Sequence, residues 1–198
     1  MSLAKIPLAG VIGSPIAHSK SPQIHGHWLK TLGLKGAYIP LHVEPEDLRQ
    51  VLEAMPKMGF IGANVTIPHK EAVIEIADII TDRAAMIGAV NTITFRADGK
   101  IQGDNTDGYG FIENLKAGAP NWVSGDGPAC VFGAGGAARA VISSLLDAGV
   151  PEILLANRTR VRAERLRSVF GNRVTVYDWS QAGTMVSHAG LVVNTTSL

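Results

Sequence analysis

The sequence predicts an α/β protein in which an N-terminal mixed-sheet domain is followed by a Rossmann-like domain. Short apolar runs of strand length alternate with helical patterns along the whole chain. A hairpin signal, Asp98-Gly99, interrupts this alternation in the first half, because Asp-Gly accepts the positive φ angles of a tight turn. A glycine-rich loop over Gly133–Ala138 opens a second alternating unit.

The first half reads as β-α-β-α-β followed by an antiparallel hairpin, and this order implies a mixed sheet. The turn of the hairpin is Ala97-Asp98-Gly99-Lys100. Strands are expected at Ile6–Ile12, Ala37–Val43, Ala63–Ile67, Ala89–Arg96 and Lys100–Gly103, and helices at about Ser21–Leu32, Pro45–Met55, Pro68–Ala77 and Thr81–Met86.

The second half begins after a boundary. A helix over Gly108–Ala117 leads out of the first domain, and Gly118–Gly127 is rich in Gly, Pro, Asn and Ser. We expect a first domain over residues 1–107, a linking helix and linker over 108–127, and a second domain over 128–198. The second is a βαβαβ unit with right-handed crossovers, and its last strand should lie beside its first. Its strands are expected at Pro128–Phe132, Glu152–Asn157, Arg173–Tyr177 and Leu191–Thr195, and its helices at Gly136–Ala148 and Thr159–Phe170.

The composition argues against several classes of function. A formal net charge of +1 over 198 residues gives no electrostatic case for binding nucleic acid or an anionic membrane surface. The apolar runs are too short to cross a bilayer, and no signal peptide is recognisable. The single Cys130 cannot form an internal disulfide, which indicates a cytoplasmic protein, and its apolar setting indicates a packed thiol. His25 and His27 face different directions on a helix, and the histidines indicate no metal site.

The glycine-rich loop reads G-x-G-x-x-A, follows a strand and opens a helix. Glycines there let the backbone approach a pyrophosphate, and the helix N-terminus supplies free N–H donors. A tight strand-to-helix turn with close packing is the structural alternative. The residues concerned are Gly133, Ala134, Gly135, Gly136, Ala137 and Ala138.

The end of the next strand distinguishes the two nicotinamide cofactors. An NAD-binding unit places an acid about 20 residues past the loop to hold the ribose 2′-hydroxyl. This chain has Asn157-Arg158-Thr159 instead, with Arg160 and Arg162 close behind. A guanidinium and a hydroxyl suit a 2′-phosphate, whereas a merely solvated basic helix start is disfavoured by the helix dipole. The sequence therefore favours NADP over NAD.

Two serines, Ser19 and Ser21, flank a lysine where the first strand gives way to a helix. One hydroxyl would suffice to cap the helix. The pair followed by Pro22 leaves two interpretations open, capping and turn chemistry or an anion site at the positive end of the helix.

The first domain contains a lysine in an unusual position. Lys70 would fall in the first turn of a helix that begins at Pro68, where the dipole disfavours the ammonium form. A proton-transferring lysine requires such a setting, although an exposed surface lysine is the plain alternative. Asn91 and Asp107 lie at strand ends or edges, where open α/β sheets bind ligands, although Asp107 could simply cap the next helix.

Six motifs occur in a characteristic order over nearly the whole chain, namely HSKSPQIH, GANVTIPHK, GAVNT, GDNTDGYG, GAGGAA and NRT. Together they resemble the shikimate dehydrogenase family. The resemblance implies reduction of 3-dehydroshikimate to shikimate with NADPH in aromatic amino-acid (chorismate) biosynthesis. It also implies a small-molecule substrate and a monomer or homodimer.

The resemblance implies roles for residues of the first domain. Ser19 and Ser21 would bind the substrate carboxylate, and Asn64, Thr66 and Asn91 would hold the ring hydroxyls.

It also implies a catalytic pair that contacts the substrate, Lys70 with its carboxylate partner Asp107. Asp107 would orient the lysine. Asp82 would lie near the cofactor, and Arg158 with Asn157, Thr159 and Arg162 would clasp the 2′-phosphate.

The family continues beyond the final Val193–Leu198 with a glycine and a longer segment that carries a substrate-facing tyrosine and glutamine. We therefore expect a Rossmann-like domain whose C-terminal part is absent. Two alternatives remain. A quinate or quinate/shikimate dehydrogenase often uses NAD, and Ser21 and Arg158 argue against it. A non-catalytic NADP-binding module is the other, and the presence of both Lys70 and Asp107 argues against that.

Overall fold

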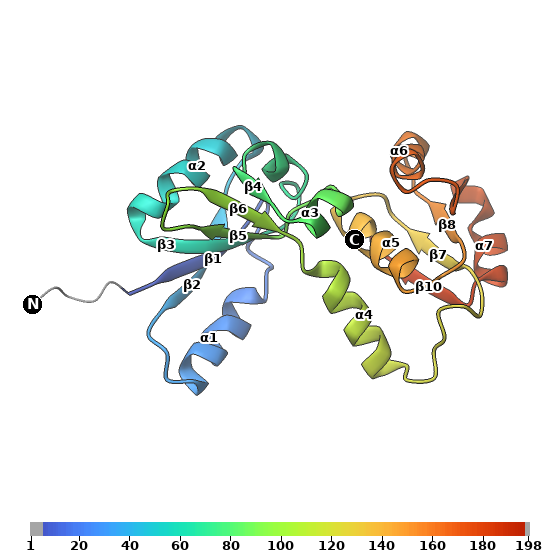
Figure 1. Cartoon of the computed structure of the whole chain (residues 1–198), viewed down its shortest axis with the longest axis horizontal. Helices are drawn as coiled ribbons and strands as arrows, with labels where there is room; N and C mark the ends of the chain where they lie inside the picture. Colours follow the sequence, from blue (N-terminus) through green and yellow to red (C-terminus); the bar gives the residue numbers. More distant parts are fainter. Residues whose placement is uncertain (1–5, 197–198) are drawn as a thin grey trace, which may run out of the picture. The chain divides into compact units, whose positions relative to one another are not determined.

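The computed structural model describes residues 6–196, and the chain divides into two compact units between Asn105 and Thr106. Both units are built of strands alternating with helices (Figure 1). The first has a mixed sheet and the second a parallel one, which confirms the predicted fold class.

The sheet of the first unit has the strand order β2-β1-β3-β5-β6-β4. Strand β1 runs parallel to both of its neighbours, and β5 runs antiparallel to β3 and β6. The β5–β6 pair is the predicted hairpin, closed by Asp98-Gly99 with Gly99 at φ 83°. The strands are β1 (Leu8–Gly13), β2 (Ala37–His42), β3 (Phe60–Val65), β4 (Ile79–Ile80), β5 (Thr92–Phe95) and β6 (Ile101–Asp104).

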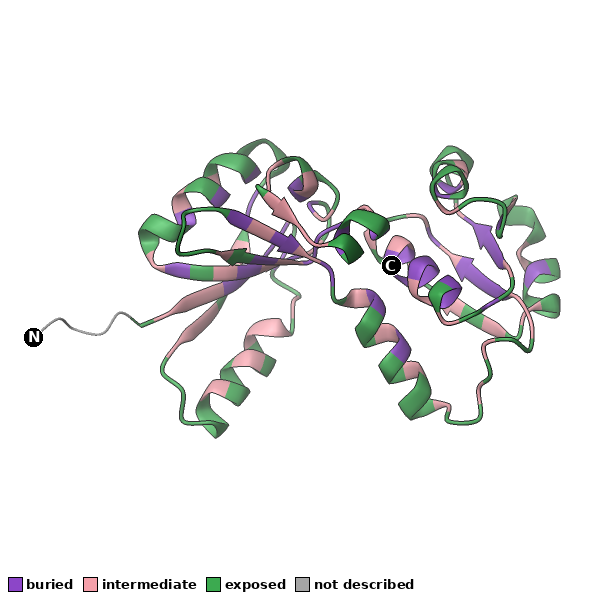
Figure 2. Ribbon diagram, viewed as in Figure 1, coloured by how far each residue is buried: buried purple, intermediate pink, exposed green. Residues whose placement is uncertain are grey.

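Helices α1 and α2 lie on opposite faces of this sheet (Figure 1). The core forms on the α2 side, where Leu48 and Leu52 pack with Ile12 and Val65 of the strands. Helix α1 contains no buried residue, and the contrast between the two faces is visible in Figure 2. The helical elements are α1 (Ser21–Thr31), η1 (Pro45–Asp47), α2 (Leu48–Ala54), η2 (Met55–Met58), η3 (Ala72–Glu75) and α3 (Asp82–Ile87), where η denotes a 3₁₀ helix.

The second unit has a parallel sheet in the order β10-β7-β8-β9, so the last strand lies beside the first as predicted. Helix α4, expected in the linking segment, packs on α5 of this unit. The elements are α4 (Asp107–Gly118), β7 (Ala129–Phe132), α5 (Gly136–Asp147), β8 (Ile153–Ala156), α6 (Arg160–Phe170), β9 (Val174–Tyr177), η4 (Trp179–Gln181), α7 (Ala182–His188) and β10 (Leu191–Asn194).

Alternate residues of β7 face opposite sides of this sheet. Val131 packs under α5 against Ile142, whereas Cys130 faces α7 and contacts the cluster that contains Met185. Cys130 is fully buried, and this burial raises the pKa of its thiol to about 11. The cysteine is therefore a packed core residue, as its setting in the sequence predicted.

The predicted helix over Pro68–Ala77 is wrong. Residues 67–71 form turns, and only Ala72–Glu75 is helical, as a short 3₁₀ helix. The reason is tertiary, because the carbonyl of Lys70 accepts a hydrogen bond from Val90 N–H at 2.7 Å. In an α-helix that oxygen would accept the N–H of Ile74, which here donates to the Glu71 carbonyl at 3.3 Å instead.

Helix α7 and the two-residue strand β4 were not predicted. A signal for α7 exists, because Asp178 and Gln181 form a reciprocal capping box at the start of η4. Strand β4 is held by its pairing of Ile79 and Ile80 with β6, which no local pattern announces.

Candidate active site

The sheet of the first unit positions most of the predicted substrate-binding residues at the carboxyl ends of its strands. Asn64 pairs with Val11 of β1 on one side and with Thr92 of β5 on the other. Thr92 is in turn opposite Asp104, the last residue of β6. The carboxyl ends of β1, β3 and β6 therefore meet the start of β5, and ligands of open α/β sheets bind at such an edge.

The two serines lie at the start of α1 and are half-buried. The N-cap residue of the helix is Lys20, which makes no side-chain cap bond. Instead the Ser19 hydroxyl oxygen accepts a hydrogen bond from the backbone N–H of Ser21 at 3.3 Å. Because Ser19 uses only its oxygen there, its O–H proton can still be donated to an anion.

Ser21 and Asn64 are joined by Tyr38 of β2, a residue that the sequence analysis missed. The Tyr38 hydroxyl donates to Asn64 Oδ1 at 2.7 Å and is also hydrogen-bonded by the Ser21 side chain. Burial raises the pKa of Tyr38 to about 12, although the bond from Ser21 lowers it. The signal in the sequence was a tyrosine in a strand beside the site, since a partly buried phenol requires a polar partner.

Asn64 and Asn91 are brought together at the start of the hairpin. Asn64 Nδ2 donates weakly to the Asn91 carbonyl at 3.4 Å and to Thr92 Oγ1 at 3.3 Å. The Thr92 hydroxyl then donates to Asn91 Oδ1 at 2.8 Å. Asn91 is buried, with 8% of its surface exposed. The two amides are held by neighbouring polar groups and present a hydrogen-bonding surface of defined geometry.

Thr66 and Lys70 lie on the loop after β3. The Thr66 N–H donates to the Ile12 carbonyl at 2.9 Å, and its methyl group lies so close to Gly13 that a Cβ there would meet it at 2.7 Å. Lys70 is half-buried. Lys70 lies on a turn and not in the first turn of an α-helix that begins at Pro68, so the helix-dipole argument for a proton-transferring lysine there has no structural basis.

His69 anchors this loop to the segment that follows β2. It is 1% exposed, and its Nε2 donates to the Val43 carbonyl at 2.8 Å. Burial lowers the pKa of His69, and its hydrogen bond to Val43 and the nearby Glu44 oppose that effect. A neutral imidazole with a proton on Nε2 satisfies this geometry.

Asp104 is a structural carboxylate at the same sheet edge. It pairs with Arg83 through both oxygens and accepts a hydrogen bond from the Thr81 hydroxyl at 2.6 Å. The Arg83 guanidinium, with smaller contributions from Thr81 and the Asn105 N–H, lowers the pKa of Asp104 to about 2. Asp82 is exposed in the first turn of α3, where a carboxylate is favourable to the helix dipole.

Asp107 belongs to the second unit, as the first residue of α4. The N-cap of that helix is Thr106, so Asp107 does not cap it. A carboxylate in the first turn is nevertheless stabilised by the helix dipole.

The phosphate loop joins β7 to α5. Gly133 has φ 109°, and a Cβ on it would collide with the Thr195 hydroxyl. A Cβ on Gly135, in contrast, would meet no described protein atom within 4 Å, and α5 begins at the next residue without a side-chain cap. Ala138 is fully buried against the sheet. The loop thus leaves backbone N–H groups at a helix start open to an anion.

The arginines of the basic segment after β8 differ in their ion pairing. Arg160 is paired with Asp178 at 2.7 Å and with Glu164 at 3.0 Å. Within residues 6–196 Arg158 and Arg162 form no ion pair, and both are exposed. The Asn157 side chain donates to the Thr159 carbonyl at 2.9 Å, and Thr159, the N-cap of α6, makes no side-chain cap bond. The charges of Arg158 and Arg162 are therefore available to a phosphate.

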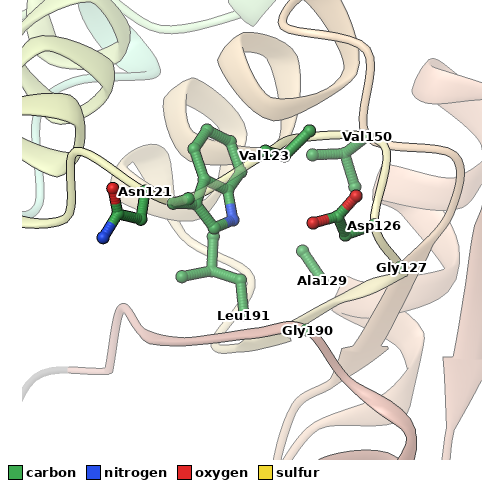
Figure 3. Close-up of a pocket in the computed structure, with 9 residues that line it drawn as sticks. Asn121, Val123, Asp126, Gly127, Ala129, Val150, Gly190 and Leu191 are labelled. Carbon is green, nitrogen blue, oxygen red and sulfur yellow. The ribbon is translucent and has the colours of Figure 1, made fainter.

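A cavity lies elsewhere in the second unit (Figure 3). Its volume is about 240 Å³. It is lined by Ala129 and Leu191, the first residues of β7 and β10, together with Val150 and Asp126. These are the amino ends of the strands, whereas the phosphate loop leaves the carboxyl end of β7. The cavity is therefore separate from the predicted cofactor site.

Residues 6–196 contain neither a metal-binding cluster nor a membrane-spanning helix. No group of three or more His, Cys, Asp or Glu side chains in that range could hold a metal ion. No helix there has the length and apolar character that a membrane crossing needs.

Two protein-family models match this chain. The model of the shikimate dehydrogenase substrate binding domain matches residues 11–93, and that of shikimate / quinate 5-dehydrogenase matches residues 124–198. A "Shikimate dehydrogenase (NADP(+))" from Ruegeria sp. (strain TM1040) is 64% identical over 198 residues, which cover all of this chain and 72% of the relative.

Two solved structures show the same fold. Shikimate dehydrogenase from Aquifex aeolicus superposes with a TM-score of 0.89 at 37% identity, over 100% of this chain and 71% of that one. Shikimate 5-dehydrogenase from Thermus thermophilus, in complex with NADP(H) and shikimate, gives 0.82 at 40% identity over 97% and 69% of the chains. The chain therefore belongs to the shikimate dehydrogenase family of NADP-dependent enzymes.

Proposed function

We propose that the protein reduces 3-dehydroshikimate to shikimate with NADPH, as a step of aromatic amino-acid biosynthesis. The observation that carries the proposal is the polar sheet edge of the first unit, where two hydroxyls, two amides and Lys70 surround the carboxyl ends of the strands. A small ring with a carboxylate, hydroxyls and a carbonyl group matches this set of donors.

The substrate carboxylate is bound at the start of α1. The Ser19 O–H is free to donate while its oxygen accepts the Ser21 N–H. Ser21 adds a second hydroxyl on the same helix turn, whose proton turns from the Tyr38 oxygen to the carboxylate when substrate binds, and the helix N-terminus favours an anion. Asn64, Thr66 and Asn91 donate to or accept from the ring hydroxyls.

The cofactor site is built by the second unit, and its residues fit NADP. The loop Gly133–Ala138 receives the pyrophosphate at the start of α5. Arg158, Arg162 and the Thr159 hydroxyl hold the 2′-phosphate, since Arg160 is already neutralised by Asp178. Asn157 shapes this turn through its bond to Thr159, and Asp82 is assigned a further contact with the cofactor.

When bound, NADPH supplies the hydride that converts the ring carbonyl to an alcohol. Lys70 stabilises the negative charge that develops on the carbonyl oxygen and donates the proton that completes the hydroxyl. In the reverse direction the neutral amine accepts that proton. Asp107 orients the Lys70 ammonium.

Quinate is the second candidate substrate, because the family model that matches residues 124–198 is described as shikimate / quinate 5-dehydrogenase. Quinate carries an additional hydroxyl on the carbon that bears the carboxylate. Some quinate and quinate/shikimate dehydrogenases have threonine in place of the second serine, so Ser21 argues for shikimate.

The test follows the reduced nicotinamide cofactor by absorbance, with shikimate or quinate as substrate; the product is NADPH when NADP⁺ is the oxidant and NADH when NAD⁺ is the oxidant. We expect the highest kcat/KM for shikimate with NADP⁺. A preference for quinate with NAD⁺ would favour the quinate enzyme. Binding of NADP⁺ by calorimetry without binding or turnover of either acid would indicate a non-catalytic module.

A further inference from the structure

Tyr38 connects two parts of the proposed substrate site, Ser21 at the start of α1 and Asn64 near the end of β3. Its ring stacks on His25 of α1, with ring centroids 4.0 Å apart and an angle of 6° between the planes. In the sheet, Tyr38 pairs with Ala9 of β1, and Asn64 pairs with Val11 two residues further along the same strand. Residues two apart share a face, so Tyr38 and Asn64 point to the same side of the sheet, with β1 between them.

The Tyr38 hydroxyl crosses β1 to reach Asn64. The distance from Tyr38 Oη to Asn64 Oδ1 is 2.7 Å, which is the usual length of a strong O–H···O bond. The small Ala9 side chain leaves room for the phenol on this face. The ring stack on α1 and the hydroxyl bond to β3 are therefore separate contacts, made by different parts of one side chain.

The hydrogen bonds around Tyr38 run in one direction. Asn64 Oδ1 can only accept, so the phenolic proton of Tyr38 points to it, and without substrate the Ser21 hydroxyl donates to the phenolic oxygen. The Asn64 carbonyl oxygen is thereby turned toward β2, and Nδ2 is turned toward Thr92 of β5. The contacts of Nδ2, at 3.3 and 3.4 Å, are long, and they leave it able to donate to a closer acceptor.

We propose that Tyr38 is a positioning residue, whose hydroxyl fixes the Asn64 amide so that this side chain is a hydrogen-bond donor to a ring hydroxyl of the substrate. The inference rests on the proposed function, because it assumes that Asn64 contacts shikimate. Without the phenolic proton, the Asn64 amide can rotate by half a turn and present its oxygen instead of its NH₂ group. In the parent protein the Asn64 amide is already ordered as a donor, whereas without the Tyr38 hydroxyl the amide must be ordered when substrate binds, and this ordering weakens the binding free energy.

The experiment replaces Tyr38→Phe, which keeps the ring stacked on His25 and removes only the hydroxyl. Tyr177→Phe is the matched control, since within residues 6–196 the Tyr177 hydroxyl makes no hydrogen bond and lies in the other unit. Asn64→Ala and the double variant Tyr38→Phe/Asn64→Ala complete a double-mutant cycle. For each protein we measure the Kd of shikimate by calorimetry, kcat and KM for shikimate and NADP⁺, and Tm.

We expect Tyr38→Phe to raise the Kd and KM for shikimate by about three- to tenfold, the loss of one ordinary hydrogen bond. The KM for NADP⁺ should not change, kcat should change less than KM, and Tyr177→Phe should behave as the parent. In the Asn64→Ala background, Tyr38→Phe should have no further effect, because there is no amide left to orient.

Two results would overturn the inference while leaving the proposed function intact. One is an unchanged Kd for shikimate in Tyr38→Phe. The other is a rise in Kd whose free-energy cost simply adds to that of Asn64→Ala in the double variant, whether or not Tm also falls. Such additivity would mean that Tyr38 does not act through Asn64 and has a purely structural role. A parent protein that neither binds nor oxidises shikimate would refute the proposed function itself, and this inference with it.

Discussion

The carbonyl oxygen of Lys70 accepts a hydrogen bond from the N–H of Val90 at 2.7 Å. This bond fastens the loop that carries the lysine to the segment that leads into Asn91. The backbone of Lys70 is thus held by the fold independently of its side chain, so removal of the ammonium group should not displace the loop.

Replacement of Lys70 by alanine should therefore affect chemistry rather than folding. We expect kcat to fall by about two to four orders of magnitude, the range for loss of a general acid, with a much smaller change in KM. Steady-state kinetics with shikimate and NADP⁺ measures both. Lys57→Ala, at an exposed lysine of η2, is the control. A near-normal kcat with a greatly raised KM would make Lys70 a binding residue only.

Ser19→Ala and Ser21→Ala should each weaken shikimate binding. A hydroxyl that donates to a carboxylate contributes about 1.5–3 kcal/mol, and calorimetry gives the loss directly. Ser19→Ala should also lower Tm, because Ser19 accepts the N–H of Ser21 at the start of α1. Ser168→Ala, at an exposed serine of α6, is the control. If both variants bind shikimate like the parent and only unfold more easily, the capping interpretation is right.

Arg158→Asp should change the choice of cofactor. The substitution removes a partner of the 2′-phosphate and installs the acid that NAD-binding units place on the ribose. The ratio of kcat/KM for NADP⁺ to that for NAD⁺ should fall by at least about tenfold, or about 1.4 kcal/mol. Arg165→Asp, at an exposed position further along α6, should leave the ratio unchanged. No change in Arg158→Asp would assign the phosphate to Arg162, because Arg160 is held by Asp178.

His69 should make stability depend on pH. Burial lowers its pKa below the ordinary value of 6.5, so on acidification the unfolded chain binds a proton that the folded protein resists. The contribution of His69 to the free energy of unfolding is thus fully present above about pH 6.5 and is lost as the pH falls toward the folded pKa. Urea unfolding at pH 7.5 and 5.5 measures this loss.

His69→Gln keeps a donor for the Val43 carbonyl and removes the titration. The loss of stability between the two pH values should be smaller in this variant than in the parent. His27→Gln, at an exposed histidine of α1, should retain the full loss. Equal losses in the parent and in His69→Gln would show that other groups account for the acid sensitivity.

Local patterns were sufficient for most of the framework. The apolar runs that became β1, β7 and β8 bury most of their side chains, and such burial dictates residue type along most of the element. The Asp98-Gly99 turn and the glycine loop after β7 were readable because each needs a backbone conformation that few residues adopt. Family motifs likewise indicated the polar residues of the candidate site.

Contacts between distant segments decided the rest. Lys70 lies on a turn rather than a helix because its carbonyl accepts a hydrogen bond from Val90, 20 positions away. A local sequence pattern contains no information about such a distant hydrogen-bond partner. Tyr38 entered the site because β1 separates β2 from β3 by the width of one strand, so a phenol can span the gap to Asn64. Arg158 and Arg160 are two residues apart, and the sequence does not distinguish their roles. In the fold Asp178, which follows β9, pairs with Arg160 and not with Arg158. Local sequence patterns thus determined most helices and strands, and the motifs indicated the candidate functional groups. The hydrogen bonds and ion pairs that give each group its partner depend on distances that only the folded chain sets.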